Sequence, residues 1–175
     1  MNNRLSAFDR HSLRIKDYDY TQSGAYFITV CTYNRECILG SINHSEVILT
    51  NYGQFVREEW LRTTSFRNGV TLDIFIVMPN HFHGIIIIDD LGTRHRAPTT
   101  EQFGKPTSNS IPAIIRGFKS AVTNQINSHR HTSGFPVWQR NYYEHVIRND
   151  NELNAIREYI QYNPENWEKD EEFVS

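Results

Sequence analysis

The segment TLDIFIVMPNHFHGIIIID, residues 71–89, contains two apolar runs separated by Pro79 and Asn80. Proline and asparagine are typical of tight turns, whereas valine, isoleucine and phenylalanine are typical of β-strands. The segment therefore predicts a β-hairpin. Its second strand begins with His81 and His83, two imidazoles at the mouth of an isoleucine run that is otherwise suited to burial.

The spacing of these histidines predicts that they share one face of the strand. Side chains at positions i and i+2 point the same way, so His81 and His83 present both imidazoles together while Phe82 faces the opposite side. Two convergent neutral imidazoles can bind a divalent metal ion. The alternative is that both histidines are solvated residues near a turn, which is common for an isolated pair of this kind.

Patterns on both sides of the hairpin predict the rest of the fold. They indicate strands at residues 25–32 and 137–148, and helices within residues 45–64, at 110–129 and at 149–163. The order β-α-β-β-α-β-α predicts an α+β fold of the ferredoxin-like split βαβ kind, an antiparallel sheet with helices, plus one appended C-terminal helix.

Length and composition predict one domain over residues 1–175, with 38% apolar residues to form its core. The core is expected at about residues 24–167, with an irregular loop at 91–110 and a peripheral acidic tail at 165–175. The opening residues are polar and charged, and every apolar run is far shorter than the roughly 20 residues of a membrane helix. We therefore expect a cytoplasmic protein without a membrane partner.

The formal net charge of −2 hides an uneven distribution. Residues 94–148 contain 8 lysines and arginines against 2 acidic residues, whereas residues 149–175 contain 2 against 8. A local basic region in an otherwise neutral protein suits binding to the phosphates of nucleic acid. The alternative is an uneven distribution without function, and charge alone does not decide between the two.

The last predicted helix places two polar side chains on one face. Tyr159 and Asn163 are four residues apart, and they border a stripe of Leu153, Ile156 and Ile160 that is expected to pack on the sheet. A phenol and an amide oxygen would then point together toward the histidines. The alternative is a packed tyrosine and an asparagine that ends the helix before Pro164.

Histidines, tyrosine and asparagine together suit phosphoryl transfer. A metal ion polarises a phosphate oxygen, and a tyrosine attacks phosphorus. An unperturbed tyrosine has a pKa near about 10, so a base must take its proton at neutral pH. His145 and Glu144 on the preceding strand are candidates for this base, although the sequence does not identify it.

Two motifs resemble a known family. The stretch PNHFHGIII is similar to the HUH motif (histidine, bulky apolar residue, histidine), and VWQRNYYEHVIRNDNELNAIREYIQYNPENW, residues 137–167, resembles the C-terminal block of REP-associated tyrosine transposases. These are relatives of the single-tyrosine HUH transposases of insertion sequences. The resemblance extends from Gly24 to Trp167, and the motifs occur in the same order.

The resemblance implies roles for four residues. His81, His83 and Asn163 would bind a divalent metal, Mg²⁺ or Mn²⁺, and Tyr159 on the appended helix would be the catalytic nucleophile. The insertion-sequence branch commonly has glutamine where this chain has Asn163. The implied activity is cleavage and rejoining of single-stranded DNA through a 5′-phosphotyrosine intermediate, at hairpin-forming repeat sequences.

Further residues of the basic region are candidates for binding DNA. Cations that could contact phosphates and aromatic rings that could stack on bases are Arg116, Lys119, Arg140, Arg148, Trp138, Tyr142 and Tyr143. Each of them could instead be a solvated cation or a core aromatic.

Two other functions stay open from the sequence, a metal-dependent hydrolase that uses the histidine pair and a non-catalytic domain that binds hairpin DNA. The sequence is compatible with a monomer or a homodimer.

Overall fold

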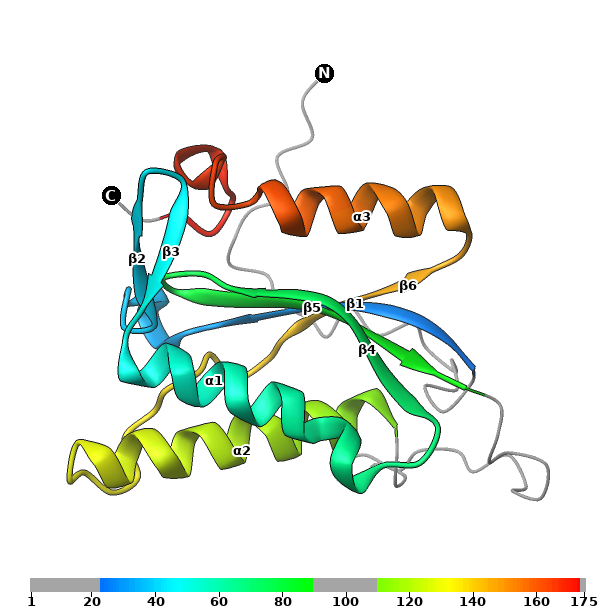
Figure 1. The fold of residues 1–175 in the computed structure, drawn as a ribbon. Helices are drawn as coiled ribbons and strands as arrows, with labels where there is room; N and C mark the ends of the chain where they lie inside the picture. The colour runs from blue at the N-terminus through cyan, green and yellow to red at the C-terminus, as the bar shows by residue number, and fades with distance from the viewer. Residues whose placement is uncertain (1–22, 90–109, 174–175) are drawn as a thin grey trace.

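The computed structural model describes residues 23–89 and 110–173, which form a four-stranded sheet with helices on both faces (Figure 1). The strands are β1 (Gly24–Cys31), β4 (Val70–Val77), β5 (His81–Ile88) and β6 (Tyr143–Ile147), in the order β4-β5-β1-β6 with every neighbouring pair antiparallel. Helices α1 (Asn51–Arg62) and α2 (Ile111–His129) cover one face, and α3 (Asp150–Tyr162) covers the other. The predicted α+β fold is confirmed, because this strand order is that of a split βαβ sheet.

Both later helices begin where their capping residues predict. The side chain of Ser110 accepts a hydrogen bond from the Ala113 amide at the start of α2, and that of Asn149 accepts one from the Glu152 amide at the start of α3. Apart from Ser110, the loop predicted at residues 91–110 lies outside the described residues.

The prediction of a helix over residues 45–64 is wrong for its first residues, which form a strand. A separate hairpin of β2 (Gly40–Asn43) and β3 (Glu46–Leu49) precedes α1. His44 and Ser45 join the two strands with φ of 49° and 63°, the left-handed pair typical of a two-residue hairpin turn. The apolar residues of β3, Val47 to Leu49, form too short a run to distinguish a strand from a helix, and pairing with β2 decides the outcome.

The alternation of side chains along β5 divides the interior into two layers. Phe82 points into the main core, where its ring centroid lies 4.5 Å from that of Trp60 and 5.4 Å from that of Phe118. Gly84 leaves room for this cluster, since a Cβ at this position would lie 2.6 Å from Cζ2 of Trp60. The histidines of β5 therefore face the opposite layer, under α3.

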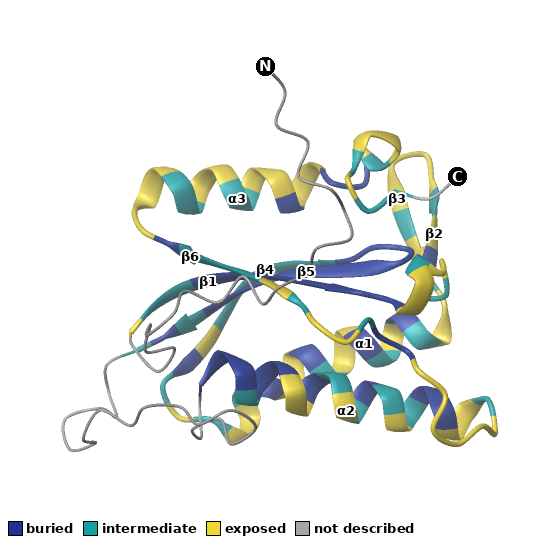
Figure 2. Ribbon diagram, turned by 180° about the vertical axis from the view of Figure 1, so that it is seen from behind, coloured by how far each residue is buried: buried dark blue, intermediate teal, exposed yellow. Residues whose placement is uncertain are grey.

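Helix α3 packs on the second face through the stripe that its sequence predicts. Ile160 is fully buried against Phe27 and Ile85, and Leu153 and Ile156 pack against the same cluster. Figure 2 shows the outer side of α3 exposed over largely buried strands. A further tie is Arg157, whose Nε donates to Oδ2 of Asp73 on β4 at 3.1 Å. The helix is thus fixed in position over the histidines.

None of the described helices is long and apolar enough to cross a membrane.

Gly53→Ala is predicted to destabilise the fold although alanine favours helices. A Cβ at Gly53 would lie 2.1 Å from the carbonyl oxygen of Leu39, which is held by the Thr50 amide. Gly117→Ala in α2 is the matched control, because its Cβ would have an ordinary contact of 3.5 Å with Arg67. In urea unfolding we expect a loss of about 1–3 kcal/mol for the first change and a gain of up to about 1 kcal/mol for the second. Stabilisation by Gly53→Ala would contradict the close packing of α1 on Leu39.

Candidate metal and nucleophile site

Two buried imidazoles lie between the beginning of β5 and the end of α3. The ring centroids of His81 and His83 are 4.4 Å apart, and the two side chains are 0% and 2% exposed. Their burial follows from the strand alternation, which places them under α3 while Phe82 occupies the other layer. His81 and His83 therefore share one face of the strand, as their spacing predicts.

Helix α3 brings the predicted tyrosine to these histidines. The Tyr159 hydroxyl lies 3.2 Å from Nε2 of His83, and the two ring centroids are 5.2 Å apart. Asn163 is the residue that ends α3, one turn beyond Tyr159, and its side chain is also buried. The structure thus brings together the four residues to which the resemblance assigns metal binding or nucleophilic attack.

Asp170 is a member of the site that sequence reasoning missed. Its Oδ2 accepts hydrogen bonds from the Tyr159 hydroxyl at 3.1 Å and from Nδ2 of Asn163. Ligand atoms of His81, His83 and Asp170 all lie within 4.8 Å of one another. The acidic segment is expected to be peripheral, and much of it is exposed, but Asp170 within it lies at the histidines. The only signal in the sequence is the acidic run itself, which does not indicate which carboxylate turns inward.

Each imidazole has a hydrogen-bonding partner behind it. Nδ1 of His81 lies 2.9 Å from Oδ1 of Asn80, and Nδ1 of His83 lies 2.8 Å from Oγ1 of Thr29. Both partners are themselves buried. Partners of this kind orient imidazoles that bind metals, so that the other nitrogen faces the ion.

Burial controls the ionisation of the site. It lowers the pKa of His81 to about 4, although Asp170 and Asn163 raise it in part. Burial, followed by the charge of His81, also lowers the pKa of His83 well below its ordinary value. Burial raises the pKa of Tyr159, and the nearby carboxylates of Asp170, Glu171 and Glu172 raise it further. At neutral pH the site thus holds two neutral imidazoles and a protonated phenol.

The donor atoms fit a divalent metal. Nε2 of His81 and Oδ1 of Asn163 are buried without a hydrogen-bonding partner among the described residues. A buried polar atom without a partner is costly, and a metal ion would satisfy both atoms at once. Two imidazole nitrogens with amide and carboxylate oxygens suit Mn²⁺ and other divalent transition metals well, and the oxygens also suit Mg²⁺.

The two residues considered as bases have other partners. Nε2 of His145 lies 2.6 Å from a carboxylate oxygen of Glu152, and Glu144 accepts a hydrogen bond from the Tyr142 hydroxyl at 2.8 Å. Asp170 is the carboxylate that contacts Tyr159 directly.

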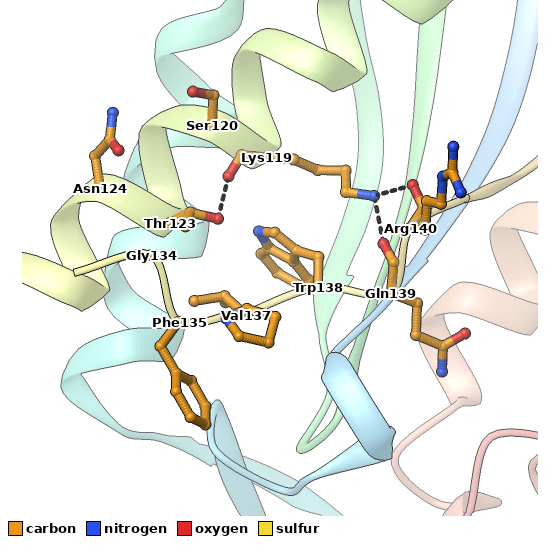
Figure 3. A pocket seen from close by; sticks show the side chains of 11 residues that line it. Lys119, Ser120, Thr123, Asn124, Gly134, Phe135, Val137, Trp138, Gln139 and Arg140 are labelled. Atoms are coloured by element: carbon orange, nitrogen blue, oxygen red, sulfur yellow. Dashed lines mark hydrogen bonds between the residues drawn. The ribbon is translucent and has the colours of Figure 1, made fainter. Parts of the chain in front are cut away.

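Three DNA-binding candidates line a groove beside α2. The groove has a volume of about 350 Å³, and Figure 3 shows Lys119, Trp138 and Arg140 along it. The Lys119 ammonium donates to the carbonyl oxygens of Gln139, Arg140 and Asn141 at 2.7 to 3.2 Å, so it fixes the path of this segment. Burial lowers the pKa of Lys119 to about 8.

The other candidates lie on different surfaces. Tyr143 is exposed on the same face as the metal site, with its ring centroid 6.2 Å from that of Phe27, which also contacts the rings of His83 and Tyr159. Arg148 is exposed just after β6, and Arg116 is exposed on α2. Tyr142 is partly buried against the main core.

The groove and the metal site are joined through the end of β1. Trp138 forms an isolated β-bridge with Thr32, and the Thr32 amide donates to the carbonyl oxygen of Asn80, the residue before His81. The segment that carries Trp138 is therefore linked, through the backbone of Thr32, to the residue that precedes His81.

The lowered pKa of His81 predicts a pH-dependent stability. The unfolded chain takes up a proton near its ordinary pKa of about 6.5 while the folded imidazole stays neutral, so the free energy of unfolding should fall from pH 6.5 toward about 4. In metal-free protein His81→Gln should flatten this decline, because an amide cannot be protonated in this range. Urea unfolding at several pH values measures the effect, on the order of a few kcal/mol at most. Equal slopes for parent and variant would contradict a depressed pKa at His81.

Comparison with known proteins tests the resemblance that the motifs suggest. No family model matches the chain. An "Uncharacterized protein" of Haemophilus influenzae is 41% identical over 170 residues, which are 94% of this chain and 93% of that protein. A second protein of the same organism, named "Putative REP-associated tyrosine transposase", is 29% identical over 149 residues, 83% of this chain and 73% of that protein.

A solved structure shares the fold. It is a REP-associated tyrosine transposase bound to a REP hairpin, with a TM-score of 0.55 and 19% identity over 89% of this chain and 74% of that one. The resemblance indicated by the two motifs is thereby confirmed, and the chain is similar to REP-associated tyrosine transposases in its sequence and in its fold.

Proposed function

We propose that this protein is a transposase that cleaves and rejoins single-stranded DNA, with Tyr159 as the nucleophile and a divalent metal as cofactor. The observation that carries the proposal is the contact of 3.2 Å between the Tyr159 hydroxyl and His83, beside a second buried imidazole with an unpartnered nitrogen. The similarity to REP-associated tyrosine transposases supports it, and the hairpin bound to one of them suggests hairpin-forming repeats as substrate.

His81 and His83 would hold the metal through their Nε2 atoms, with an oxygen from Asn163 or Asp170. When bound, Mg²⁺ or Mn²⁺ supplies charge that polarises the scissile phosphate. The protein contributes a buried site in which these donors are already oriented, so little reorganisation is needed when DNA binds.

Tyr159 is both held and accessible. Its ring packs edge-on against Phe27, with centroids 6.1 Å apart, while 45% of the residue remains exposed. The hydroxyl end lies at the histidines, and the exposed side is open to a strand of DNA. A helix packed through Ile160 positions such a nucleophile more rigidly than a loop would.

The chemistry conserves the energy of the broken bond. Tyr159 Oη forms a bond to phosphorus while the bond from phosphorus to the 3′ oxygen breaks, and that oxygen takes a proton to become a 3′ hydroxyl. The phenol proton passes to Oδ2 of Asp170, the carboxylate to which it is already hydrogen-bonded. Attack by a 3′ hydroxyl on the phosphotyrosine reverses these steps and rejoins DNA without a nucleotide cofactor.

The DNA path would follow the basic region toward the site. Arg140 and Trp138 lie in the groove beside α2, and Tyr143 stands exposed beside Phe27 next to the nucleophile. Arginines can contact phosphates, and an exposed aromatic ring can stack on an unpaired base. Arg116, Arg148, Lys119 and Tyr142 remain candidates for weaker or indirect contributions.

Tyr159→Phe is predicted to abolish cleavage and the covalent adduct. The change removes one oxygen and keeps the ring against Phe27, so the fold and DNA binding should persist. Incubation with a hairpin oligonucleotide labelled at the 3′ side of the cut, with Mg²⁺ or Mn²⁺, followed by denaturing electrophoresis, detects the adduct. Tyr162→Phe and Tyr143→Phe are controls that should still form it, because neither hydroxyl contacts His83.

Other outcomes would favour the competing functions. An adduct that persists in Tyr159→Phe makes the nucleophile assignment wrong. Metal-dependent cleavage without any adduct in the parent protein would favour a hydrolase. Tight hairpin binding with no cleavage by the parent protein would favour a non-catalytic DNA-binding domain.

Tyr143→Ala is predicted to weaken binding to DNA with an unpaired end by about 1–3 kcal/mol, the usual loss when a stacking ring is removed. Phe66→Ala is the control, since Phe66 is an even more exposed aromatic residue (79% against 42% for Tyr143) that follows α1 and does not line the groove. Fluorescence anisotropy should show tighter binding to a hairpin than to a blunt duplex, with affinity falling as salt rises. Equal losses for both variants would count against stacking by Tyr143.

A further inference from the structure

We infer that Asn80 and Thr29 are positioning residues that determine which ring nitrogen of each histidine carries its hydrogen. Asn80 holds His81 in one tautomer permanently, whereas Thr29 allows His83 to change its tautomer when a metal binds. The part that concerns Thr29 and His83 rests on the proposed function. The part that concerns Asn80 does not, because the tautomer of His81 is determined without a metal.

The contacts of Asn80 leave one orientation for its amide. Nδ2 lies 3.2 Å from the carbonyl oxygen of Arg35 and 2.7 Å from that of Glu172, and carbonyl oxygens can only accept hydrogen bonds. The amide nitrogen must therefore face them, and the oxygen Oδ1 must face His81. Oδ1 also only accepts, so Nδ1 of His81 carries the hydrogen of their 2.9 Å contact.

This orientation prepares His81 as a ligand. With the hydrogen on Nδ1, the lone pair is on Nε2, the buried nitrogen that has no partner in the site. Asn80 is itself fixed, because it is fully buried and its carbonyl oxygen accepts from both the amide and the hydroxyl of Thr32. Through Glu172 it also holds the segment that carries Asp170, so one side chain orders two parts of the site.

His83 is the opposite tautomer in this structure, with its hydrogen on Nε2. The Tyr159 hydroxyl has a single hydrogen, which it donates to the Asp170 carboxylate. At its 3.2 Å contact with the phenol oxygen, Nε2 of His83 must therefore be the donor. Nδ1 then accepts from the Thr29 hydroxyl at 2.8 Å.

Metal binding requires His83 to change. A metal needs the lone pair of Nε2, so the ring must lose the hydrogen at Nε2 to solvent and gain one at Nδ1, which leaves its charge unchanged. A hydroxyl can accept as well as donate, so Thr29 can support both forms by rotating its hydrogen. The exchange also removes the hydrogen bond from His83 to the phenol oxygen. Metal binding would thereby free the nucleophile.

Long-range ¹H–¹⁵N correlation spectra of histidine-labelled protein test this at neutral pH. In metal-free protein we expect His81 protonated at Nδ1 and His83 at Nε2. With Zn²⁺, a diamagnetic probe, both rings should be protonated at Nδ1. Protonation of His81 at Nε2 in metal-free protein would overturn the role of Asn80, and an unchanged His83 with zinc bound would overturn the role of Thr29.

Variants at Thr29 separate positioning from packing. Thr29→Val keeps the shape but has no hydroxyl, whereas Thr29→Ser keeps the hydroxyl and loses a methyl group. Calorimetric titration with Zn²⁺ should show about 10–100-fold weaker binding for the valine variant and near-parent binding for the serine variant. Equal affinity of the valine variant and the parent would overturn the inference. If the parent binds no zinc, the proposed metal dependence is wrong, and the metal-free spectrum still decides the form of His81.

Discussion

The alternation of side chains along β5 is the constraint on which the rest of the structure depends. Phe82 anchors the main core against Trp60, and the same pleat turns His81 and His83 toward α3. A shift of the strand by one residue would exchange the two layers, burying imidazoles among the aromatic rings and exposing Phe82 to the site. The register that buries Phe82 in the main core is therefore the same register that places both histidines under α3.

Helix α3 has two tasks that its sequence combines. Its apolar stripe covers the second face of the sheet, with Ile160 buried against Ile85, and its border carries Tyr159 and the terminal Asn163. The bulge between Leu72 and Phe75 contributes to this placement, because it presents Asp73 to Arg157. Apolar packing and the ion pair of Arg157 with Asp73 thus hold the helix that carries Tyr159, and they do so through residues other than those that the hydroxyl contacts.

The site balances burial against charge. Burial keeps both imidazoles neutral, which suits metal binding but means that neither imidazole supplies a positive charge to stabilise a phenolate. The nearby carboxylates keep Tyr159 protonated as well. A bound metal and the phosphate would change the charge at this site. Asp170 would be affected directly, because it is hydrogen-bonded to both Tyr159 and Asn163.

The sequence by itself predicted the strands of the main sheet, the helices and the four residues proposed for the site. Periodicity and caps predicted the β4–β5 hairpin, α2 and α3, and fixed spacings placed His81 with His83 and Tyr159 with Asn163, because these relations extend over one strand pleat or one helical turn. Tertiary structure decided the β2–β3 hairpin, the inward turn of Asp170 and the contacts of Thr29 and Asn80. Thr29 and His83 are 54 residues apart, and Asn80 and Glu172 are 92 apart. Strand pairing and the path of the C-terminal segment bring such distant partners together, and no local sequence pattern predicts either of them.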